Sequence, residues 1–227
     1  MKIGIVGSGD IGSTLGRLWA KAGHRIYYSF SHDRQKLERL AAEAGNESKA
    51  VTPYDAVRCS DVVLFSVPWD EQDEAIKQMG RFEGQIVIDT TNPFGPGMRV
   101  ESFDENDSSS EHVARKLPGA KVIKAFNTLK DETLAARSGQ GLVVFFAGDY
   151  PLVKQNEIAT LVRDAGFVPF DAGPLHEGKK QEPNTDRFLN ELTLEQAEQL
   201  AGPAQSRAET GEIDGRTSQT TIPRRTV

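Results

Sequence analysis

The chain is short of cysteine, of histidine and of long apolar runs, and each shortage excludes a class of protein. Cys59 is the single cysteine, so the chain has no disulfide framework. The four histidines are scattered and lack the spacing of metal ligands, so we expect no metal site. No apolar stretch approaches the roughly 20 residues that a membrane-spanning helix needs, so we expect no membrane partner.

Positive charge is also in deficit. Lys and Arg number 27 against 33 Asp and Glu, which leaves a formal net charge of −6. With no basic stripe, nucleic acid is not expected as a partner. Met1 leads directly into the first apolar run with no room for a signal peptide, so we expect a cytoplasmic protein. The 227 residues suffice for one sizeable domain, or for a domain with an appendage.

Residues 1–36 have the order strand, glycine-rich turn, helix and strand, which is typical of dinucleotide-binding folds. The apolar run 2–6 leads into Gly7-Ser8-Gly9-Asp10-Ile11-Gly12, and a helical pattern follows with Ile11, Leu15, Leu18 and Ala22 on one face. Gly7 permits a tight turn, Gly9 lets the backbone approach the phosphates, and Gly12 lets helix and strand pack closely. The helix N-terminus would then face the pyrophosphate. A glycine turn that binds nothing is the alternative.

The end of the second strand predicts NADP(H) rather than NAD. Enzymes that prefer NAD place Asp or Glu about 20 residues past the glycines. Here the chain has Ser29, Ser31, His32, Arg34 and Lys36. Hydroxyls and cations can bind a 2′-phosphate that a carboxylate would repel. Three alternatives stay open: Asp33 acts only as a helix cap, His32 is simply solvent-exposed, and Arg34 and Lys36 are ordinary solvated helix charges.

Beyond residue 36, apolar strands alternate with amphipathic helices. This predicts an α/β fold of the Rossmann type, doubly wound, with a mostly parallel sheet and helices on both faces. Strands are expected at 49–51, 61–67, 85–89, 121–128, 142–147 and, as an edge, 167–170. Helices are expected at 33–44, 52–60, 70–79, 111–117, 130–137 and 149–165. Cys59 is expected to pack in the interior.

Two strand ends are expected to flank the glycine turn, because ligands on open parallel sheets lie at the carboxyl ends of strands. They are Val67-Pro68-Trp69 and Thr91-Asn92-Pro93. Trp69 either stacks near a planar ring or packs beneath a helix. Residues 94–110 have the composition of a mobile acidic loop, either simply solvated or a lid.

The last part of the chain is polar. We expect residues 1–175 to form the NADP-binding domain and residues 176–227 to form a C-terminal extension that cannot bury a core of its own. Thr193 and Gln196 have the spacing of a capping box for one short helix, and residues after about 203 are expected to be disordered.

Six strings together resemble the NADP oxidoreductases dependent on coenzyme F-420: residues 1–12, 31–36, 67–69, 89–93, 124–128 and 171–175. The resemblance covers residues 1 to about 175. It implies hydride exchange between NADP(H) and a deazaflavin, coenzyme F-420, or a flavin in relatives. It also implies that Ser8 to Ile11 hold the pyrophosphate and that Ser31, His32 and Lys36 hold the 2′-phosphate. Val67, Asn92 and Ala125 would line the nicotinamide pocket. The family commonly has Arg at the position of His32, so Arg34 is expected to supply that charge.

Hydride transfer between stacked rings depends mainly on positioning, and the sequence offers no Ser-His-Asp set, metal site or matched carboxylate pair. Our hypothesis is that Pro68, Asn92, Ala125 and Asn127 present the nicotinamide without an obligatory general acid. Asn127 either hydrogen-bonds a ring substituent or only satisfies backbone groups in a turn.

Two alternative functions stay open. The first is an NADPH-dependent reductase of a small carbonyl or imine substrate, for which His176 is the candidate proton donor. The second is a non-catalytic NADP(H)-binding module. A homodimer is compatible with either function.

Overall fold

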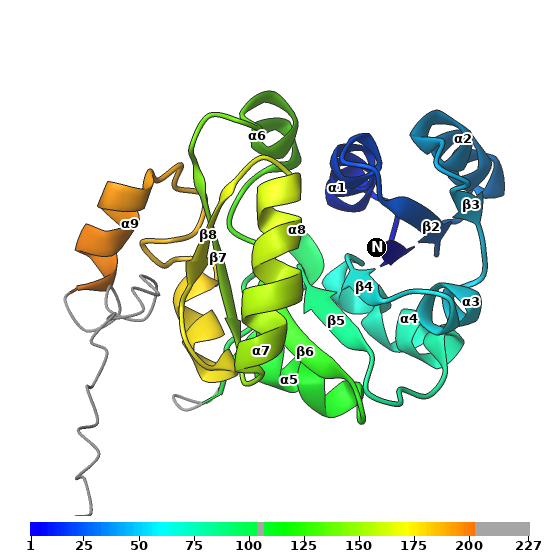
Figure 1. Ribbon diagram of the computed structural model, residues 1–227. Helices are drawn as coiled ribbons and strands as arrows, with labels where there is room; N and C mark the ends of the chain where they lie inside the picture. The colour runs from blue at the N-terminus through cyan, green and yellow to red at the C-terminus, as the bar shows by residue number, and fades with distance from the viewer. Residues whose placement is uncertain (104–106, 203–227) are drawn as a thin grey trace, which may run out of the picture.

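Within the residues that the structure describes, eight strands form one sheet in the order β3-β2-β1-β4-β5-β6-β7-β8 (Figure 1). The computed structural model describes residues 1–103 and 107–202. The strands are β1 (Lys2–Val6), β2 (Arg25–Ser29), β3 (Lys49–Ala50), β4 (Val62–Phe65), β5 (Ile86–Asp89), β6 (Lys121–Ala125), β7 (Val143–Gly148) and β8 (Val168–Asp171). Neighbours are parallel except β6 and β7, which are antiparallel. The chain reverses its direction of travel across the sheet at β1, where β4 takes the free side, so the predicted doubly wound fold is confirmed.

Helices cover both faces of the sheet. One face carries α1 (Asp10–Lys21), α2 (Arg34–Ala44), α6 (Asp131–Ala136) and the continuous helix of α7 (Pro151–Val153), the π-helical η3 (Lys154–Ile158) and α8 (Ala159–Asp164). The other face carries α3 (Pro53–Arg58), α4 (Gln72–Met79) and α5 (Ser109–Lys116). Successive residues of β4 point to opposite cores, Val62 to the first and Val63 to the second. This explains why the strand is apolar without alternation.

Helix α1 packs on the sheet through Leu15 and Trp19, which are fully buried. Trp19 Nε1 donates a hydrogen bond of 2.8 Å to the carbonyl of Leu161, which links α1 to α8. The predicted apolar face is correct at Leu15 but wrong at Ala22, which is exposed at the helix C-terminus. Trp19 takes its place because the helix ends before Ala22 can reach the core.

Other predicted elements lie within a few residues of the observed ones, with three informative differences. Cys59 was expected in the interior but is exposed at the end of α3. Helix α5 begins earlier than predicted, because Ser108 caps it and Ser109 and Ser110 are buried. Strand β6 ends earlier than predicted, because Phe126 adopts a positive φ of 61° and turns the chain. The edge position of β8 is confirmed.

The C-terminal segment packs on the sheet. The 3-10 helix η4 (Leu175–Gln181) buries Leu175 in the second core, and α9 (Leu194–Ala201) buries Ala197 against β7 and β8. The capping box of Thr193 and Gln196 is confirmed. The disorder predicted beyond about residue 203 lies outside the described residues, as do residues 104–106 of the predicted acidic loop. Within the described ranges, no helix combines the length and the apolar character needed to cross a membrane.

Candidate functional site

The turn after β1 is shaped by three glycines with different roles. Gly7 has a φ of +99°, and a Cβ added there would lie 2.1 Å from the carbonyl oxygen of Ser66. A Cβ added to Gly12 would lie 2.1 Å from the carbonyl oxygen of Gly7. A Cβ on Gly9 would meet nothing within 4 Å. Gly7 and Gly12 are therefore required by packing, whereas Gly9 leaves open space in front of the helix.

That open space faces the start of α1. Gly9 is the N-cap residue, and no side chain caps the helix there. Because the first N–H groups of a helix lack intrahelical acceptors, the turn presents backbone donors to any anion in front of it. Ser8 supports the turn from behind: its Oγ donates to the carbonyl of Ser29 over 3.2 Å. The expected cradle for a pyrophosphate is thus formed by backbone.

A cavity of about 770 Å³ extends from this turn toward α2. His32, Arg34 and Lys36 line one side of it together with Ser31. Ser29 was expected among them, but its side chain is buried and its Oγ donates to the carbonyl of Ile5 over 2.8 Å. Ser29 therefore holds β2 to β1 and is absent from the residues that line the cavity. The other residues predicted for the 2′-phosphate site, Ser31, His32, Arg34 and Lys36, all line the same cavity.

The carboxylate of Asp33 is engaged by the start of α2 and by Arg39. Its Oδ1 accepts a hydrogen bond of 3.1 Å from the backbone N–H of Lys36, and its Oδ2 lies 3.3 Å from Arg39. The hydrogen bond from Lys36 is the main reason that the pKa of Asp33 lies below its usual value. Asp33 is the N-cap of α2 and is not among the cavity-lining residues, so the helix-cap interpretation is confirmed.

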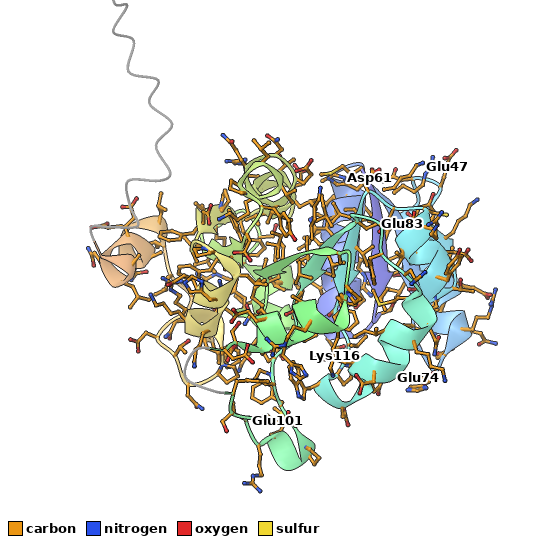
Figure 2. The ribbon with its side chains drawn as sticks, turned by 90° about the horizontal axis from the view of Figure 1, so that it is seen from below. Glu47, Asp61, Glu74, Glu83, Glu101 and Lys116 are labelled. Carbon is orange, nitrogen blue, oxygen red and sulfur yellow. The ribbon has the colours of Figure 1, made fainter. Side chains whose placement is uncertain are left out.

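The opposite wall of this cavity is acidic. Glu71 and Glu74 line it from the start and first turn of α4, and Figure 2 shows Glu74 on that helix. His32 Nε2 lies 3.7 Å from Glu71 Oε1, so these two lining side chains are neighbours. The His32 side chain is 93% exposed, and Arg34 is held by Glu38 through a 3.1 Å contact.

A second cavity of about 690 Å³ continues the first beyond the glycine turn. Gly9, Ser66 and Pro68 line both cavities. The second one also has walls from Val67, Trp69, Thr91 and Asn92 and from the loop 94–98. The carboxyl ends of β1, β4 and β5 therefore meet in one continuous crevice, as the sequence predicted.

Trp69 both lines this crevice and anchors the loop beside it. Its Nε1 donates to Glu101 over 2.7 Å, and its ring lies 5.8 Å from that of Phe103 and 5.7 Å from that of His112. Figure 2 shows Glu101 on the loop that projects below the sheet. This loop includes η2 (Pro96–Met98), whose Met98 is 71% exposed. Residues 94–98, in the described part of the predicted acidic loop, therefore line the cavity with mainly apolar groups.

Asn127 and Ala125 lie behind the crevice wall. Asn127 Nδ2 donates to Asn92 Oδ1 over 3.0 Å and to the carbonyl of Gln181 over 2.7 Å, and Asn92 Nδ2 donates back to the Asn127 carbonyl over 3.1 Å. Asn127 is only 4% exposed, and Ala125 is fully buried. Neither lines the cavity, which favours the turn-satisfying interpretation of Asn127. Asn92 is the member of this set that reaches the crevice.

A buried ion pair near Asn92 was not predicted from the sequence. Asp89 and Lys124 face each other in the register of β5 and β6, with Lys124 Nζ 3.0 Å from Asp89 Oδ2 and both side chains fully buried. Asp89 Oδ1 accepts from Thr91 N–H over 2.9 Å, and Lys124 donates to the Thr91 carbonyl. The pair could have been recognised from one acidic residue and one basic residue at corresponding positions of two apolar strands.

His176 lies in a different hollow. It lines a cavity of about 580 Å³ with Asp107, Glu111 and Glu177, and its Nε2 is 3.5 Å from Glu177. Neither cavity of the crevice includes it among the lining residues. The candidate proton donor of the small-substrate reductase is therefore separated from the predicted nicotinamide site.

Several known proteins are similar to this chain in sequence and in fold. Residues 2–93 match the model of the family described as NADP oxidoreductase coenzyme F420-dependent. A hypothetical protein, SMa0349 from Sinorhizobium meliloti, is 31% identical with a TM-score of 0.76, over 85% of this chain and 95% of that chain. A candidate F420-dependent NADP reductase from Arthrobacter sp. FB24 shares the fold, with a TM-score of 0.70 at 22% identity over 85% and 99% of the two chains.

Curated relatives are longer than this chain. Metalloreductase STEAP3 of Rattus norvegicus is 25% identical over 83% of this chain, which spans 37% of that protein. The fold is also shared with a reductive aminase from Aspergillus terreus in complex with NADPH4, with a TM-score of 0.59 at 15% identity over 78% of this chain and 56% of that one. The chain belongs to the NADP oxidoreductase, coenzyme F420-dependent family, a family of oxidoreductase enzymes whose cofactor is NADP(H).

Proposed function

We propose that this enzyme transfers a hydride between NADP(H), bound along the crevice, and the ring of a deazaflavin or flavin co-substrate. The observation that carries the proposal is the junction of the two cavities at Gly9, Ser66 and Pro68. Because the cavities are continuous, one extended dinucleotide can reach from Lys36 at one end to Asn92 at the other. NADPH supplies the hydride when bound, and the protein groups described below hold and orient it.

The adenosine end is proposed to lie in the first cavity. The open face of Gly9 and the start of α1 offer backbone N–H donors to the pyrophosphate. Lys36, Arg34 and His32 line the corner where a 2′-phosphate would lie, and charge-assisted hydrogen bonds are the strong ones. Ser31 lines the same corner and adds a hydroxyl.

The nicotinamide end is proposed to lie in the second cavity. Val67 and Pro68 supply an apolar wall, and Asn92 supplies an amide that Asn127 holds in place by hydrogen bonds in both directions. Trp69 and the loop 94–98 also line this end. Since ring-to-ring hydride transfer depends mainly on positioning, these contacts suffice without an acid.

The small-substrate reductase has less support. Such a reaction needs a proton donor beside the nicotinamide, and His176 lines another hollow. Among the described residues that line the second cavity there is no histidine, lysine or tyrosine, and the ionisable groups there are the carboxyls of Asp10, Asp70 and Asp131. The shared fold with a reductive aminase extends to about half of that longer chain, so it does not identify a proton donor in this one.

The test follows the nicotinamide absorbance band while NADPH is mixed with the protein and riboflavin, flavin mononucleotide, flavin adenine dinucleotide or the deazaflavin. We expect consumption of NADPH with at least one ring compound. Asn92→Ala should slow turnover, whereas Asn190→Ala, an exposed amide outside both cavities, should not. Binding without consumption would identify a non-catalytic module, and consumption only with imines or carbonyls would favour the small-substrate reductase.

A further inference from the structure

The corner proposed for the 2′-phosphate holds a carboxylate as well as cations. His32, Arg34 and Lys36 line the cavity from the connection between β2 and α2 and from the start of α2. Glu71 lines it from η1 (Trp69–Glu71), which follows β4. Because His32 Nε2 lies 3.7 Å from Glu71 Oε1, the acid lies beside the residues predicted to hold the phosphate. Two elements distant in the chain therefore supply groups of opposite charge to one place.

The two acids of the opposite wall, Glu71 and Glu74, have different contacts. Glu74 Oε1 accepts a hydrogen bond of 2.8 Å from Gln78 Nε2, one turn further along α4. In the described part of the chain, the charged group within ion-pair distance of Glu71 is His32. Glu71 is therefore the acid of this wall whose side chain contacts the 2′-phosphate corner.

A carboxylate in this corner opposes the binding of NADPH. A phosphate carries about −1.5 to −2 charges at pH 7, and like charges a few ångströms apart repel each other. The Glu71 side chain is partly buried, so solvent and salt reduce this repulsion without abolishing it. His32 must also divide its interaction between Glu71 and the phosphate. Glu71 therefore lowers the affinity for NADPH below the value that the three cations alone would give.

The same carboxylate suits a coenzyme that lacks the 2′-phosphate. Enzymes that prefer NAD hold the ribose hydroxyls with an Asp or Glu at the end of the second strand. Here the acid nearest to that strand end, Asp33, caps α2 and is not a lining residue. Glu71 offers an acceptor of the same chemistry from the opposite wall, to which a free 2′-hydroxyl can donate a hydrogen bond.

We propose that Glu71 is a specificity-determining residue of the coenzyme site. Its carboxylate accepts a hydrogen bond from the 2′-hydroxyl of NADH and repels the 2′-phosphate of NADPH, so the site binds both coenzymes. The inference rests on the proposed function for the place of the adenosine end in the first cavity, and it adds a second coenzyme to that function.

Two substitutions of Glu71 separate its charge from its hydrogen bond. The full chain is titrated with NADPH and with NADH, and binding is followed by the fluorescence of the reduced nicotinamide, which requires no turnover. We expect saturable binding of both coenzymes. Glu71→Gln keeps an acceptor oxygen and removes the charge, so NADPH affinity should rise about two- to fivefold while NADH affinity changes less than about twofold. The rise should shrink as salt is added. Glu71→Ala removes the oxygen as well, so NADH affinity should also fall about three- to tenfold.

Asp73→Asn is the matched control, because it removes one negative charge from the first turn of α4. Asp73 pairs with Lys116 over 2.8 Å and lines neither cavity of the crevice, so both affinities should stay unchanged. Three results would overturn the inference: no saturable binding of NADH, unchanged NADPH affinity in Glu71→Gln, or unchanged NADH affinity in Glu71→Ala. A rise in NADPH affinity of equal size in Asp73→Asn would also overturn it, because the effect would then follow net charge and not the corner.

Failure of the proposed function would give a different result. If the Glu71 variants shift the two affinities as expected but no flavin or deazaflavin consumes NADPH, the hydride transfer to a ring co-substrate is refuted and the role of Glu71 stands. If a ring compound consumes NADPH while the Glu71 variants change neither affinity, the role of Glu71 alone is refuted.

Discussion

The carboxylate of Asp89 lies 3.0 Å from the ammonium nitrogen of Lys124, and neither side chain is exposed to solvent. The two residues are direct partners in the parallel ladder of β5 and β6. Both also hydrogen-bond to Thr91, the residue before Asn92. A charge pair in the core therefore secures the strand end that carries the proposed nicotinamide contact.

Breaking this pair should be costly. Asp89→Asn leaves the ammonium of Lys124 buried without its counter-charge, and we expect the free energy of unfolding to fall by about 3–5 kcal/mol. Denaturation by urea measures this. Arg58→Met, which breaks the exposed pair with Glu83, should cost less than about 1 kcal/mol. A similar small loss for Asp89→Asn would show that the core tolerates the charge.

Alanine substitutions at Gly9 and Gly16 should affect different properties. The first should weaken NADPH binding, and the second should lower the free energy of unfolding. Gly9→Ala points a methyl group into open space, so we expect the free energy of unfolding to change by at most about 1 kcal/mol while NADPH affinity falls by about tenfold or more. Gly16→Ala would place its Cβ in steric overlap with the buried Tyr28 ring and hydroxyl, and should destabilise by about 1–3 kcal/mol. Calorimetry and urea denaturation measure the two quantities. Unchanged NADPH affinity in Gly9→Ala would contradict the phosphate cradle.

A substitution at Lys36 should lower the affinity for NADPH much more than the affinity for NADH. Lys36→Met removes a cation from the corner proposed for the 2′-phosphate, and we expect NADPH affinity to fall about 10- to 100-fold, as for the loss of one charge-assisted hydrogen bond. NADH affinity should change little. Arg39→Met is the control, because Arg39 pairs with Asp33 and does not line the cavity. Equal losses for both nucleotides would place Lys36 elsewhere on the cofactor.

His112 should make stability depend on pH. It packs between Trp69 and Phe103, and burial holds its pKa below the ordinary value of 6.5. The unfolded chain therefore binds a proton at higher pH than the folded one, so this contribution to stability is complete above about 6.5 and is lost as the pH falls through the folded pKa. Urea denaturation across this window should show the slope. His112→Gln should reduce it, and an undiminished slope would assign the effect to another group.

The predicted strands and helices could be located because their signals are local. The apolar runs of β1, β4 and β5, the glycine turn and the caps at Thr52 and Thr193 are all encoded by neighbouring residues. The cationic corner followed from the same logic, since its members lie within a few positions of one another.

The side on which a strand-end residue faces was harder to predict. Ser29, Ala125 and Asn127 were all expected at the cofactor, yet each is buried and lines neither cavity of the crevice. A residue at a strand end can point to the ligand or back into the sheet, and one position in the register decides between them.

The amino-acid sequence alone determined the order of the elements, the class of the fold and the place of the glycine turn, because hydrophobic periodicity and turn chemistry act between near neighbours. Only the tertiary structure decided that Asp89 meets Lys124, that Asn127 supports Asn92 from behind, and that Asp10, Asp70 and Asp131 line the same cavity. These relationships join residues that lie far apart in the chain, and their energies depend on burial, which exists only after the layers have packed.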